Sequence, residues 1–361
     1  MFTQIKYPSL TLLRIEAVLR PNIGGGRISR SVHVYNNIIS VENLLAAWRE
    51  FLRNKRGRKD IEEFSIRLTD NVLSLHRELA DKTYRHGGYQ AFRINDPKPR
   101  DIHKAAVRDR LLHHAIYRIL YPYFDPKFIF DSYSCRRTKG THRALNRFRE
   151  YARKVSKNHT RTAWVLKCDI RKFFANIDHK VLFDILRRRI GDKEVVWLLS
   201  EVVGSFYTKD KPGVGLPLGN LTSQLLVNVY MNEFDHYLKR ELKTTYCIRY
   251  ADDFVVLHKD KRYLETILPK ISIFLQSRLK LSLHPDKVFI KTVASGVDFL
   301  GWVHFQHHRV PRSATKRRMF RNLEQNQKKG SLASYNGLLS HGNTHTLRKT
   351  INDAYKLPED T

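Results

Sequence analysis

The sequence predicts an α+β fold in which a small antiparallel sheet is backed by helices. Short runs of β-branched and aromatic residues have the character of strands, and longer segments with apolar residues three and four positions apart have the character of helices. One strand-like run, residues 164–170, is followed directly by a helical segment, which is typical of a compact α+β unit. The 361 residues correspond to about two domains of ordinary size, with ample material for a core.

The N-terminal part is predicted to be mostly helical. Residues 1–40 lack a periodic pattern and are expected to form an irregular extension. From residue 41 to 85 the apolar residues recur at helical spacing. A turn-rich stretch, 95–100, leads into another helix, which is expected to end at Tyr121-Pro122 because proline disfavours a helical residue before it.

The C-terminal part alternates between strands and helices. Asp178 is the predicted N-cap of a helix that ends at Gly191. The remaining predicted elements are a Gly- and Pro-rich loop over 211–219, a long helix over 221–242, strands over 287–290 and 299–303, and basic helices beyond Pro311.

Three acidic residues are predicted to meet at one end of the sheet. Residues 246–250 and 254–257 are the predicted strands of a β-hairpin with Asp252 and Asp253 at its tip, and Asp169 closes another predicted strand. If that strand pairs beside the hairpin, Asp169 comes close to Asp252. Two carboxylates in such proximity repel each other unless a cation lies between them.

Such a constellation suits two divalent metal ions. Magnesium prefers oxygen ligands, keeps several of its waters, and usually binds through one or two carboxylates plus substrate phosphates. Two metal ions about 3.5–4 Å apart stabilise both the attacking and the leaving oxygen of an in-line phosphoryl displacement. The predicted reaction is therefore nucleotidyl transfer with two Mg²⁺ ions, for which Mn²⁺ is an alternative. An acidic hairpin turn beside an ordinary strand-end aspartate is the other interpretation of the same residues.

The charge of the chain favours a polyanionic partner. Lys and Arg number 66 against 35 Asp and Glu, which gives a formal net charge of +31. Basic residues concentrate in 53–59 and 136–161, which are candidate contacts for a phosphate backbone. One basic run by itself is more often a solvated surface, but several of them beside a metal-type site favour nucleic acid.

The cysteines and the N-terminus exclude several classes of protein. The three cysteines lie far apart in the sequence and predict neither a disulfide framework nor a zinc site. Charged residues interrupt the apolar residues of the N-terminus, and no run reaches the roughly 18 apolar residues of a membrane span. We therefore expect a cytoplasmic protein in a reducing compartment.

The order of these motifs resembles that of reverse transcriptases over residues 90–345. Residues 166–174 resemble the first palm motif, 215–224 the nucleotide-pocket motif, 250–253 (Tyr-Ala-Asp-Asp) the catalytic hairpin, and 299–301 (Phe-Leu-Gly) the primer grip. The resemblance implies a right-hand polymerase fold. Its expected parts are an N-terminal extension (1–40), fingers (41–165), a palm (166–310) with part of the fingers inserted near 191–220, and a short helical thumb (311–361).

The resemblance also implies roles for individual residues at the catalytic site. Asp169 and Asp252 are the expected catalytic metal ligands, Asp253 is a supporting carboxylate of the same site, and the backbone carbonyl of Ile170 is a further metal ligand. Phe174 matches the steric gate, an aromatic ring that excludes a ribose 2′-hydroxyl, with plain core packing as the alternative.

Basic residues are the expected ligands of the nucleotide triphosphate. Lys98, Arg100 and Lys104 lie in one segment that resembles the fingers, and Arg136 lies in a second one. Arginine offers a planar fork for phosphate oxygens, whereas lysine supplies a point charge. A general contact with a nucleic-acid backbone is the alternative for each. Lys287 is the expected proton donor to the departing pyrophosphate.

The nucleotide-pocket motif departs from the common pattern. Many reverse transcriptases have Gln-Gly there and finish with Ser-Pro, whereas this chain has Leu218-Gly219 and finishes with Ser223-Gln224. That version resembles the enzymes of diversity-generating retroelements, within the group II intron-like reverse transcriptases. An aliphatic side chain in place of an amide removes hydrogen bonds that restrain the incoming nucleotide, which predicts error-prone copying of a template RNA. The resemblance implies that the errors fall chiefly at template adenines.

The expected partners are a template RNA, a primer and the cDNA strand, and deoxynucleoside triphosphates, with no membrane. The resemblance also implies a small basic accessory protein as a partner. The primer grip is assigned to Phe299, Leu300 and Gly301. The short segment after Pro311 is expected to leave no room for an RNase H module or for the DNA-binding and endonuclease regions of group II intron proteins.

Three other functions compete with this one. A retron or phage-defence reverse transcriptase would share the carboxylates and differ in its RNA. An RNA-dependent RNA polymerase is disfavoured by Phe174 and by the tyrosine that begins the hairpin motif. A non-catalytic RNA-binding module that keeps a polymerase shape would not need three acidic residues, because their carboxylates would repel the phosphates of its own RNA ligand.

Overall fold

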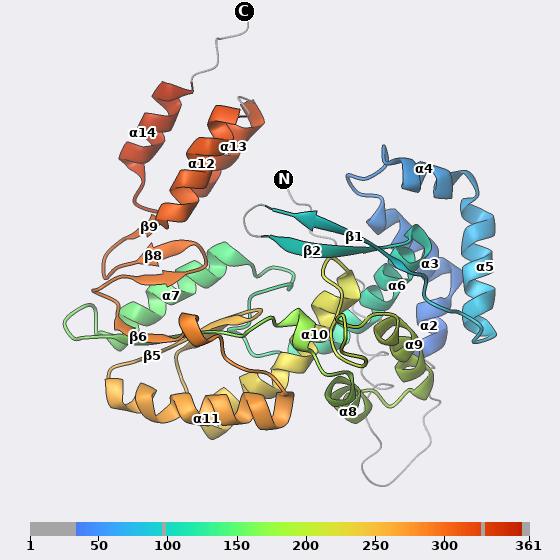
Figure 1. Ribbon diagram of the computed structural model, residues 1–361, viewed down its shortest axis with the longest axis horizontal. Helices are drawn as coiled ribbons and strands as arrows, with labels where there is room; N and C mark the ends of the chain where they lie inside the picture. Colours follow the sequence, from blue (N-terminus) through green and yellow to red (C-terminus); the bar gives the residue numbers. More distant parts are fainter. Residues whose placement is uncertain (1–33, 96–98, 326–328, 356–361) are drawn as a thin grey trace, which may run out of the picture. The chain divides into compact units, whose positions relative to one another are not determined.

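The computed structural model describes residues 34–95, 99–325 and 329–355. Helices and three separate antiparallel sheets make up this part of the chain (Figure 1), so the predicted α+β class is confirmed. The chain divides into two compact units. Among the described residues, unit 1 comprises 34–129, 172–236 and 274–281, and unit 2 comprises 130–171, 237–273 and 282–355. The partition into extension, fingers, palm and thumb stays a prediction.

Unit 1 is mostly helical, with one two-stranded sheet. Its helices and strands are α2 (Val34–Ile39), α3 (Val41–Phe51), α4 (Lys59–Ile66), α5 (Leu68–Ala80), β1 (Tyr89–Ile94), β2 (Arg100–Ala105), α6 (Val107–Phe124), α8 (His179–Arg189), α9 (Lys193–Gly204) and α10 (Leu221–His236). Helix α11 (Lys261–Leu279) contributes residues to both units.

The helical periodicity of residues 41–85 is confirmed by α3, α4 and α5. Helix α3 begins after Ser40, whose side chain accepts a hydrogen bond from the Asn43 backbone N–H at 3.2 Å. Its apolar face, which includes Leu44 and Trp48, is buried. The helix α2 corrects the expectation of an irregular segment up to residue 40, because Val34, Tyr35, Ile38 and Ile39 are all buried at helical spacing. Residues 1–33 of the predicted extension lie outside the described residues.

The prediction that α6 ends at Tyr121-Pro122 is wrong. The helix continues to Phe124 with Pro122 in its last turn, and the Asp125 N–H donates to the Tyr121 carbonyl. A proline this close to the C-terminal end removes few helical hydrogen bonds. Burial of Tyr123 and Phe124 favours the added turn.

Sequence reasoning also missed the β1–β2 hairpin and the helix α9. The hairpin flanks the turn-rich stretch at 95–100, and its strands pair from Tyr89–Ala105 to Ile94–Arg100. The N-cap at Asp178 is confirmed, since its Oδ1 accepts from the Val181 N–H at 2.9 Å. Helix α8 ends at Arg189, two residues before the expected Gly191.

Unit 2 contains two sheets and a group of C-terminal helices. Its elements are α7 (Thr141–Val155), β3 (Trp164–Asp169), a π-helical turn (Tyr237–Glu241), β4 (Cys247–Tyr250), β5 (Asp253–His258), β6 (Phe289–Thr292), β7 (Val297–Phe299), β8 (Trp302–His304), β9 (Arg309–Pro311), α12 (Ser313–Gln325), α13 (Lys329–Leu339) and α14 (His345–Ala354).

The four-stranded sheet of unit 2 has the order β4-β5-β3-β6, and every neighbouring pair is antiparallel. The strand β3 lies inside the sheet, and its apolar residues are buried on both faces, as Val165, Leu166 and Cys168 show. Helix α7 packs on one face of this sheet (Figure 1), and its buried residues share a core cluster with Val165 and Val255. The three strands predicted around the carboxylates are therefore present and paired as expected.

The two later strands are only partly as predicted. The strand β6 begins at Phe289, because Pro285–Lys287 forms a 3₁₀ turn. The run 299–303 is not one strand: it turns at Leu300 and Gly301, between β7 and β8. Both turn residues have positive φ, 51° and 84°, as a two-residue hairpin with a right-handed strand twist requires.

The helices expected beyond Pro311 are present as α12, α13 and α14. They bury a small core of their own, formed by Met319, Leu323, Leu339 and Ile351. Across the described ranges, no helix is long and apolar enough to cross a bilayer.

Candidate active site

The strand register brings the predicted carboxylates to one end of the sheet in unit 2. Asp169, the last residue of β3, lies directly opposite Asp253, the first residue of β5. Directly opposed residues of antiparallel strands have Cα atoms about 4.5–5.5 Å apart and side chains on the same face. The Ile170 N–H donates to the Asp252 carbonyl at 3.1 Å, so the hairpin turn is also attached to the end of β3.

A buried arginine that the sequence analysis did not single out holds the hairpin turn. Ala251 has φ of 56°, a left-handed conformation that is unfavourable for a residue with a Cβ. Arg249 is 1% exposed, donates from Nη1 to the Ala251 carbonyl at 3.1 Å, and donates from Nη2 to Ser132 Oγ at 2.9 Å. The signal in the sequence was a charged residue inside an otherwise apolar strand.

Lys167 is a second buried charge that sequence reasoning missed. Its side chain is 9% exposed, and its Nζ lies 3.3 Å from Oδ1 of Asp253. In the strand register Lys167 lies opposite Val255, and Asp253 is two residues before Val255 on β5. The contact is an ion pair, and Asp253 Oδ1 has no hydrogen-bond partner of good geometry within the described chain. Burial raises the pKa of Asp253 to about 7, against the opposing effect of Lys167, and the charges of Asp169 and Asp252 raise it further.

Two of the predicted phosphate ligands lie in the same unit. Lys287 Nζ donates to Asp169 Oδ1 at 3.1 Å, which places its ammonium group at the carboxylate end of the sheet. Arg136 is half-buried and donates from Nη1 to the Ser132 carbonyl at 3.0 Å. Because Ser132 also bridges to Arg249, the segment that carries Arg136 is attached to the strand β4.

Metal ions are implied by the family resemblance, and the described residues restrict how they would bind. No group of three or more His, Cys, Asp or Glu side chains in the described ranges is arranged to hold a metal ion. Magnesium bound by one or two carboxylates, water and substrate phosphates does not need such a group. A cation would also relieve the repulsion between Asp253 and its two acidic neighbours. The carboxylates therefore fit ions that are shared with a substrate.

The predicted primer grip forms the tight turn between β7 and β8. Phe299 is fully buried and its ring lies 5.8 Å from that of Phe148, so this side chain belongs to the core of unit 2. Leu300 and Gly301 are half-buried in the turn. The Gly301 carbonyl accepts from the Arg312 N–H at 3.0 Å, which ties the turn to the start of the C-terminal helices.

The nucleotide-pocket residues belong to unit 1. Phe174 and Leu218 line one cavity of about 680 Å³, together with Phe92 of β1 and His103 of β2. The Phe174 carbonyl accepts from the Leu216 N–H at 2.8 Å, which fixes its segment against the 211–219 loop. Phe174 is half-buried, whereas its neighbour in sequence, Phe173, is buried as expected for a core residue.

The hairpin β1–β2 holds the Leu218-Gly219 segment in place. The His103 N–H donates to the Leu218 carbonyl at 3.0 Å, and Asn220 Nδ2 donates to the His103 carbonyl at 3.0 Å. Gly219 has φ of 102°, and a Cβ there would lie 2.9 Å from Cγ2 of Ile102. Glycine is therefore required at this position by both conformation and space.

The remaining predicted residues of unit 1 differ in their environment. Ser223 is buried in α10 and Gln224 is half-buried beside it. Arg100 is exposed at the start of β2, whereas Lys104 forms an ion pair with Asp60 at 2.8 Å. Lys98 lies outside the described residues.

Several known proteins are similar to this chain. Protein YkfC of Escherichia coli K12 is 28% identical over 277 residues, which cover 65% of this chain and 70% of YkfC. The group II intron-encoded protein LtrA of Lactococcus lactis subsp. cremoris is 22% identical over 318 residues, covering 69% of this chain and 51% of LtrA. The chain thus spans about half the length of LtrA.

A solved structure of apo telomerase from Candida tropicalis, truncated from its C-terminal domain, superposes with a TM-score of 0.49 and 11% identity over 64% of this chain and 55% of the telomerase. The assignment itself rests on the family model described as "Reverse transcriptase (RNA-dependent DNA polymerase)", which matches residues 95–304, more than half of the chain. This protein therefore belongs to the reverse transcriptase family, RNA-dependent DNA polymerases of the right-hand fold class that its motif order predicts.

Proposed function

We propose that this chain copies RNA into DNA by nucleotidyl transfer at the carboxylate end of the β4-β5-β3-β6 sheet. The observation that supports this function most directly is the pairing of Asp169 with Asp253, with Asp252 in the adjoining turn, inside the region that matches the family. Its expected substrates are a template RNA, a primer and deoxynucleoside triphosphates.

In this proposal Asp169 and Asp252 hold divalent metal ions, with the Ile170 carbonyl as a further ligand and Asp253 as a supporting carboxylate. Bound Mg²⁺ or Mn²⁺ would neutralise phosphate charge and align the attacking 3′-hydroxyl. Lys167 keeps a positive charge next to Asp253, which favours the ionised carboxylate. Lys287, 3.1 Å from Asp169, is the proposed proton donor to pyrophosphate.

The proposed nucleotide ligands in unit 1 follow from the cavity that Phe174 and Leu218 share. Phe174 would exclude the ribose 2′-hydroxyl by its bulk, and Gly219 would permit close approach of the backbone. Arg100 is the stronger candidate for triphosphate binding than Lys104, because Lys104 already pairs with Asp60 whereas Arg100 is exposed. Arg136 is the proposed ligand from unit 2.

A finer proposal concerns fidelity. Leu218 lines the cavity with an aliphatic side chain where an amide would offer hydrogen bonds to the nucleotide. Weaker restraint of the nucleotide lowers discrimination among bases, which supports the mutagenic copying of a diversity-generating retroelement, with a small basic accessory protein as a further partner.

The catalytic proposal is tested by primer extension on an RNA template with the wild type, Asp252→Ala and the matched control Glu265→Ala. Glu265 is a half-exposed acid on α11 that pairs with Lys261, a contact of little energetic value. We expect Asp252→Ala to abolish incorporation and Glu265→Ala to retain it. Equal incorporation by the wild type and Asp252→Ala would falsify the catalytic assignment.

The fidelity proposal is tested separately, by sequencing the cDNA made by the wild type and by Leu218→Gln. We expect fewer substitutions opposite template adenines in the variant. An unchanged error spectrum counts against Leu218 as the cause. In the genome, a template and variable repeat pair beside a target gene supports the retroelement type, and a structured RNA gene or a toxin supports a retron or a defence system.

A further inference from the structure

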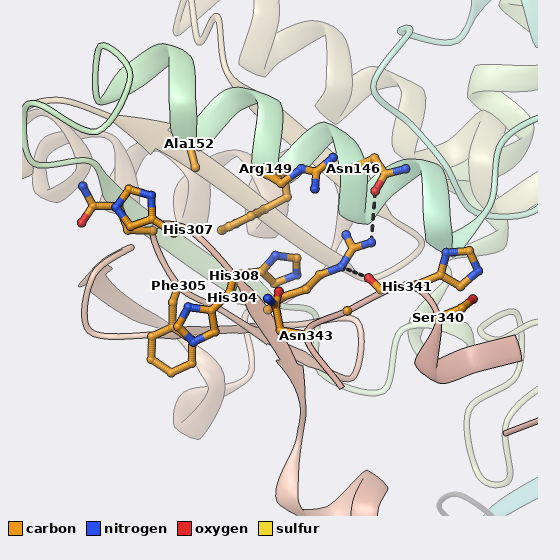
Figure 2. Close-up of a pocket in the computed structure, with 14 residues that line it drawn as sticks. Asn146, Arg149, Ala152, His304, Phe305, His307, His308, Ser340, His341 and Asn343 are labelled. Carbon is orange, nitrogen blue, oxygen red and sulfur yellow. Dashed lines mark hydrogen bonds between the residues drawn. The ribbon is translucent and has the colours of Figure 1, made fainter. Parts of the chain in front are cut away.

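A second cavity, of about 280 Å³, lies in unit 2 among three segments that no catalytic proposal uses. One wall is helix α7, another is the β8–β9 connection (305–308) with the adjoining strand ends, and the third is the loop 340–343 after α13. Figure 2 shows Arg149 and Asn146 projecting from α7, with His308 and Asn343 on the other side of the cavity.

The lining of this cavity is basic. It includes Arg149, Arg309 and four histidines and, within the part of the chain that the structure describes, no aspartate or glutamate. Arg149 is exposed, whereas Arg309 is only 8% exposed. Burial lowers the pKa of the Arg309 guanidinium, and the positive charge of Arg149 nearby lowers it further. Two guanidinium groups thus line one cavity, and no carboxylate of the described lining offsets their repulsion.

Hydrogen bonds fix the buried guanidinium but leave one of its donors unused. Arg309 donates from Nε to the His341 carbonyl and from Nη2 to Asn146 Oδ1 at 3.1 Å (Figure 2). Its Nη1 is buried and has no hydrogen-bond partner within the described residues. A buried charged donor without a partner is unfavourable, so the site is arranged for an acceptor that the described residues do not supply.

The third wall packs against the strands β8 and β9. The Asn343 N–H donates to the Arg309 carbonyl at 2.9 Å. A Cβ at Gly342 would lie 2.1 Å from the Trp302 ring, so the loop packs directly on β8. The guanidinium of Arg309 also lies 5.6 Å from the centre of the Trp302 ring. These contacts preorganise the cavity before any ligand enters.

The chemistry of the lining favours an anion over a cation. Histidines bind metals, but within the described ranges no three His, Cys, Asp or Glu side chains are arranged for a metal ion. The two arginines would also repel a cation. Guanidinium groups match the oxygens of phosphate with paired, charge-assisted hydrogen bonds, and the amide of Asn343 adds a neutral donor.

We propose that this cavity binds a phosphate group, with Arg309 as the buried anchor and Arg149 as the exposed clamp. The phosphate is carried either by a nucleic-acid strand or by a free phosphate compound. Binding of a nucleic-acid strand rests on the proposed function, because it needs a nucleic-acid ligand. Binding of a free phosphate compound does not depend on that function.

The test compares the wild type, Arg149→Gln and the matched control Arg262→Gln in the presence of EDTA, so that no catalytic step is involved. Arg262 lies on α11 in unit 2, is exposed, and lies outside both the cavity and the basic segments 53–59 and 136–161. One arm measures binding of a labelled single-stranded RNA by fluorescence anisotropy at several KCl concentrations. The other measures the rise in thermal unfolding temperature with inorganic phosphate or pyrophosphate.

If the phosphate belongs to a strand, Arg149→Gln weakens RNA binding about three- to tenfold and reduces the slope of log Kd against log salt by about 0.7, while Arg262→Gln changes neither. If it is a free phosphate, the wild type and Arg262→Gln are stabilised by the ion and Arg149→Gln is not. The proposal is overturned if Arg149→Gln and Arg262→Gln behave alike in both arms. Catalysis is absent from this assay. A protein that passes it but is inactive in primer extension would therefore support the phosphate-binding cavity and contradict the proposed polymerase function.

Discussion

Replacing Lys167 by methionine removes the positive charge beside Asp253 and keeps most of the side-chain volume. The Lys167 side chain is 9% exposed and that of Asp253 is 20% exposed, so water compensates little for the lost ion pair. Removing one partner of a buried pair costs about 3–5 kcal/mol, and the partial exposure of Asp253 favours the lower end. We expect Lys167→Met to lower the free energy of unfolding by about 3 kcal/mol at pH 8, measured by urea denaturation.

The same change should depend on pH with a definite sign. The pKa of Asp253 is already raised to about 7, and without Lys167, which lowers it, the pKa rises further. When the pKa of a carboxyl group is higher in the folded state than in the unfolded state, the folded protein loses stability as the pH rises from the unfolded-state pKa through the folded-state pKa. The loss from Lys167→Met should therefore be smaller at pH 6, where the folded protein can protonate Asp253, than at pH 8.

Two variants control for this experiment. Lys259→Met removes an exposed lysine just after β5 and should change the free energy of unfolding by no more than about 0.5 kcal/mol. Adding Asp253→Asn to Lys167→Met removes the unpaired charge and should recover most of the loss, which a double-mutant cycle measures. If Lys167→Met and Lys259→Met are equally stable, or if Asp253→Asn restores nothing, the ion pair does not stabilise this sheet as argued.

Three further outcomes follow from the structure. Gly219→Ala, at φ of 102°, should lower the free energy of unfolding in urea by about 1–3 kcal/mol. The control Gly204→Ala, where a Cβ would meet open space, should change it by no more than about 1 kcal/mol, and equal losses would contradict the strain argument. Phe174→Ala should raise the ratio of kcat/KM for ribonucleotides to kcat/KM for deoxynucleotides about tenfold or more. An unchanged ratio would show that Phe174 is not the steric gate. Burial and nearby positive charges lower the pKa of His114 to about 4, so stability should fall by up to about 3 kcal/mol from pH 6.5 to 4, and His114→Asn should flatten that part of the curve.

The elements around the carboxylates were predictable because their signals are local. The strands β3, β4 and β5 are apolar runs with few polar interruptions, and a two-residue turn joins β4 to β5. The N-cap at Asp178 is likewise a local hydrogen bond. That the three acids would share one end of a sheet followed from strand pairing alone.

The missed features depend on contacts between distant parts of the sequence. The β1–β2 hairpin has no alternating pattern, since β1 is exposed from Gln90 to Ile94, and its attachment to Leu218 bridges more than a hundred residues. The partnership of Lys167 with Asp253 exists only in one register of β3 against β5, which a strand pattern does not fix. The extra turn of α6 after Pro122 reflects burial of Tyr123 and Phe124, a tertiary effect that overrides a local preference.

The position of β3 between β5 and β6 has a consequence for synthesis on the ribosome. The strand ends at residue 169, whereas β5 ends at 258 and β6 at 292, so both neighbours emerge later. At about 5–20 residues per second, the 89 residues from 169 to 258 take roughly 4–18 s to make, and β6 ends only 34 residues later. Until β5 has been made, the nascent Val165–Cys168 segment has two unpaired edges and apolar side chains on both faces, which is the hazard that chaperones relieve.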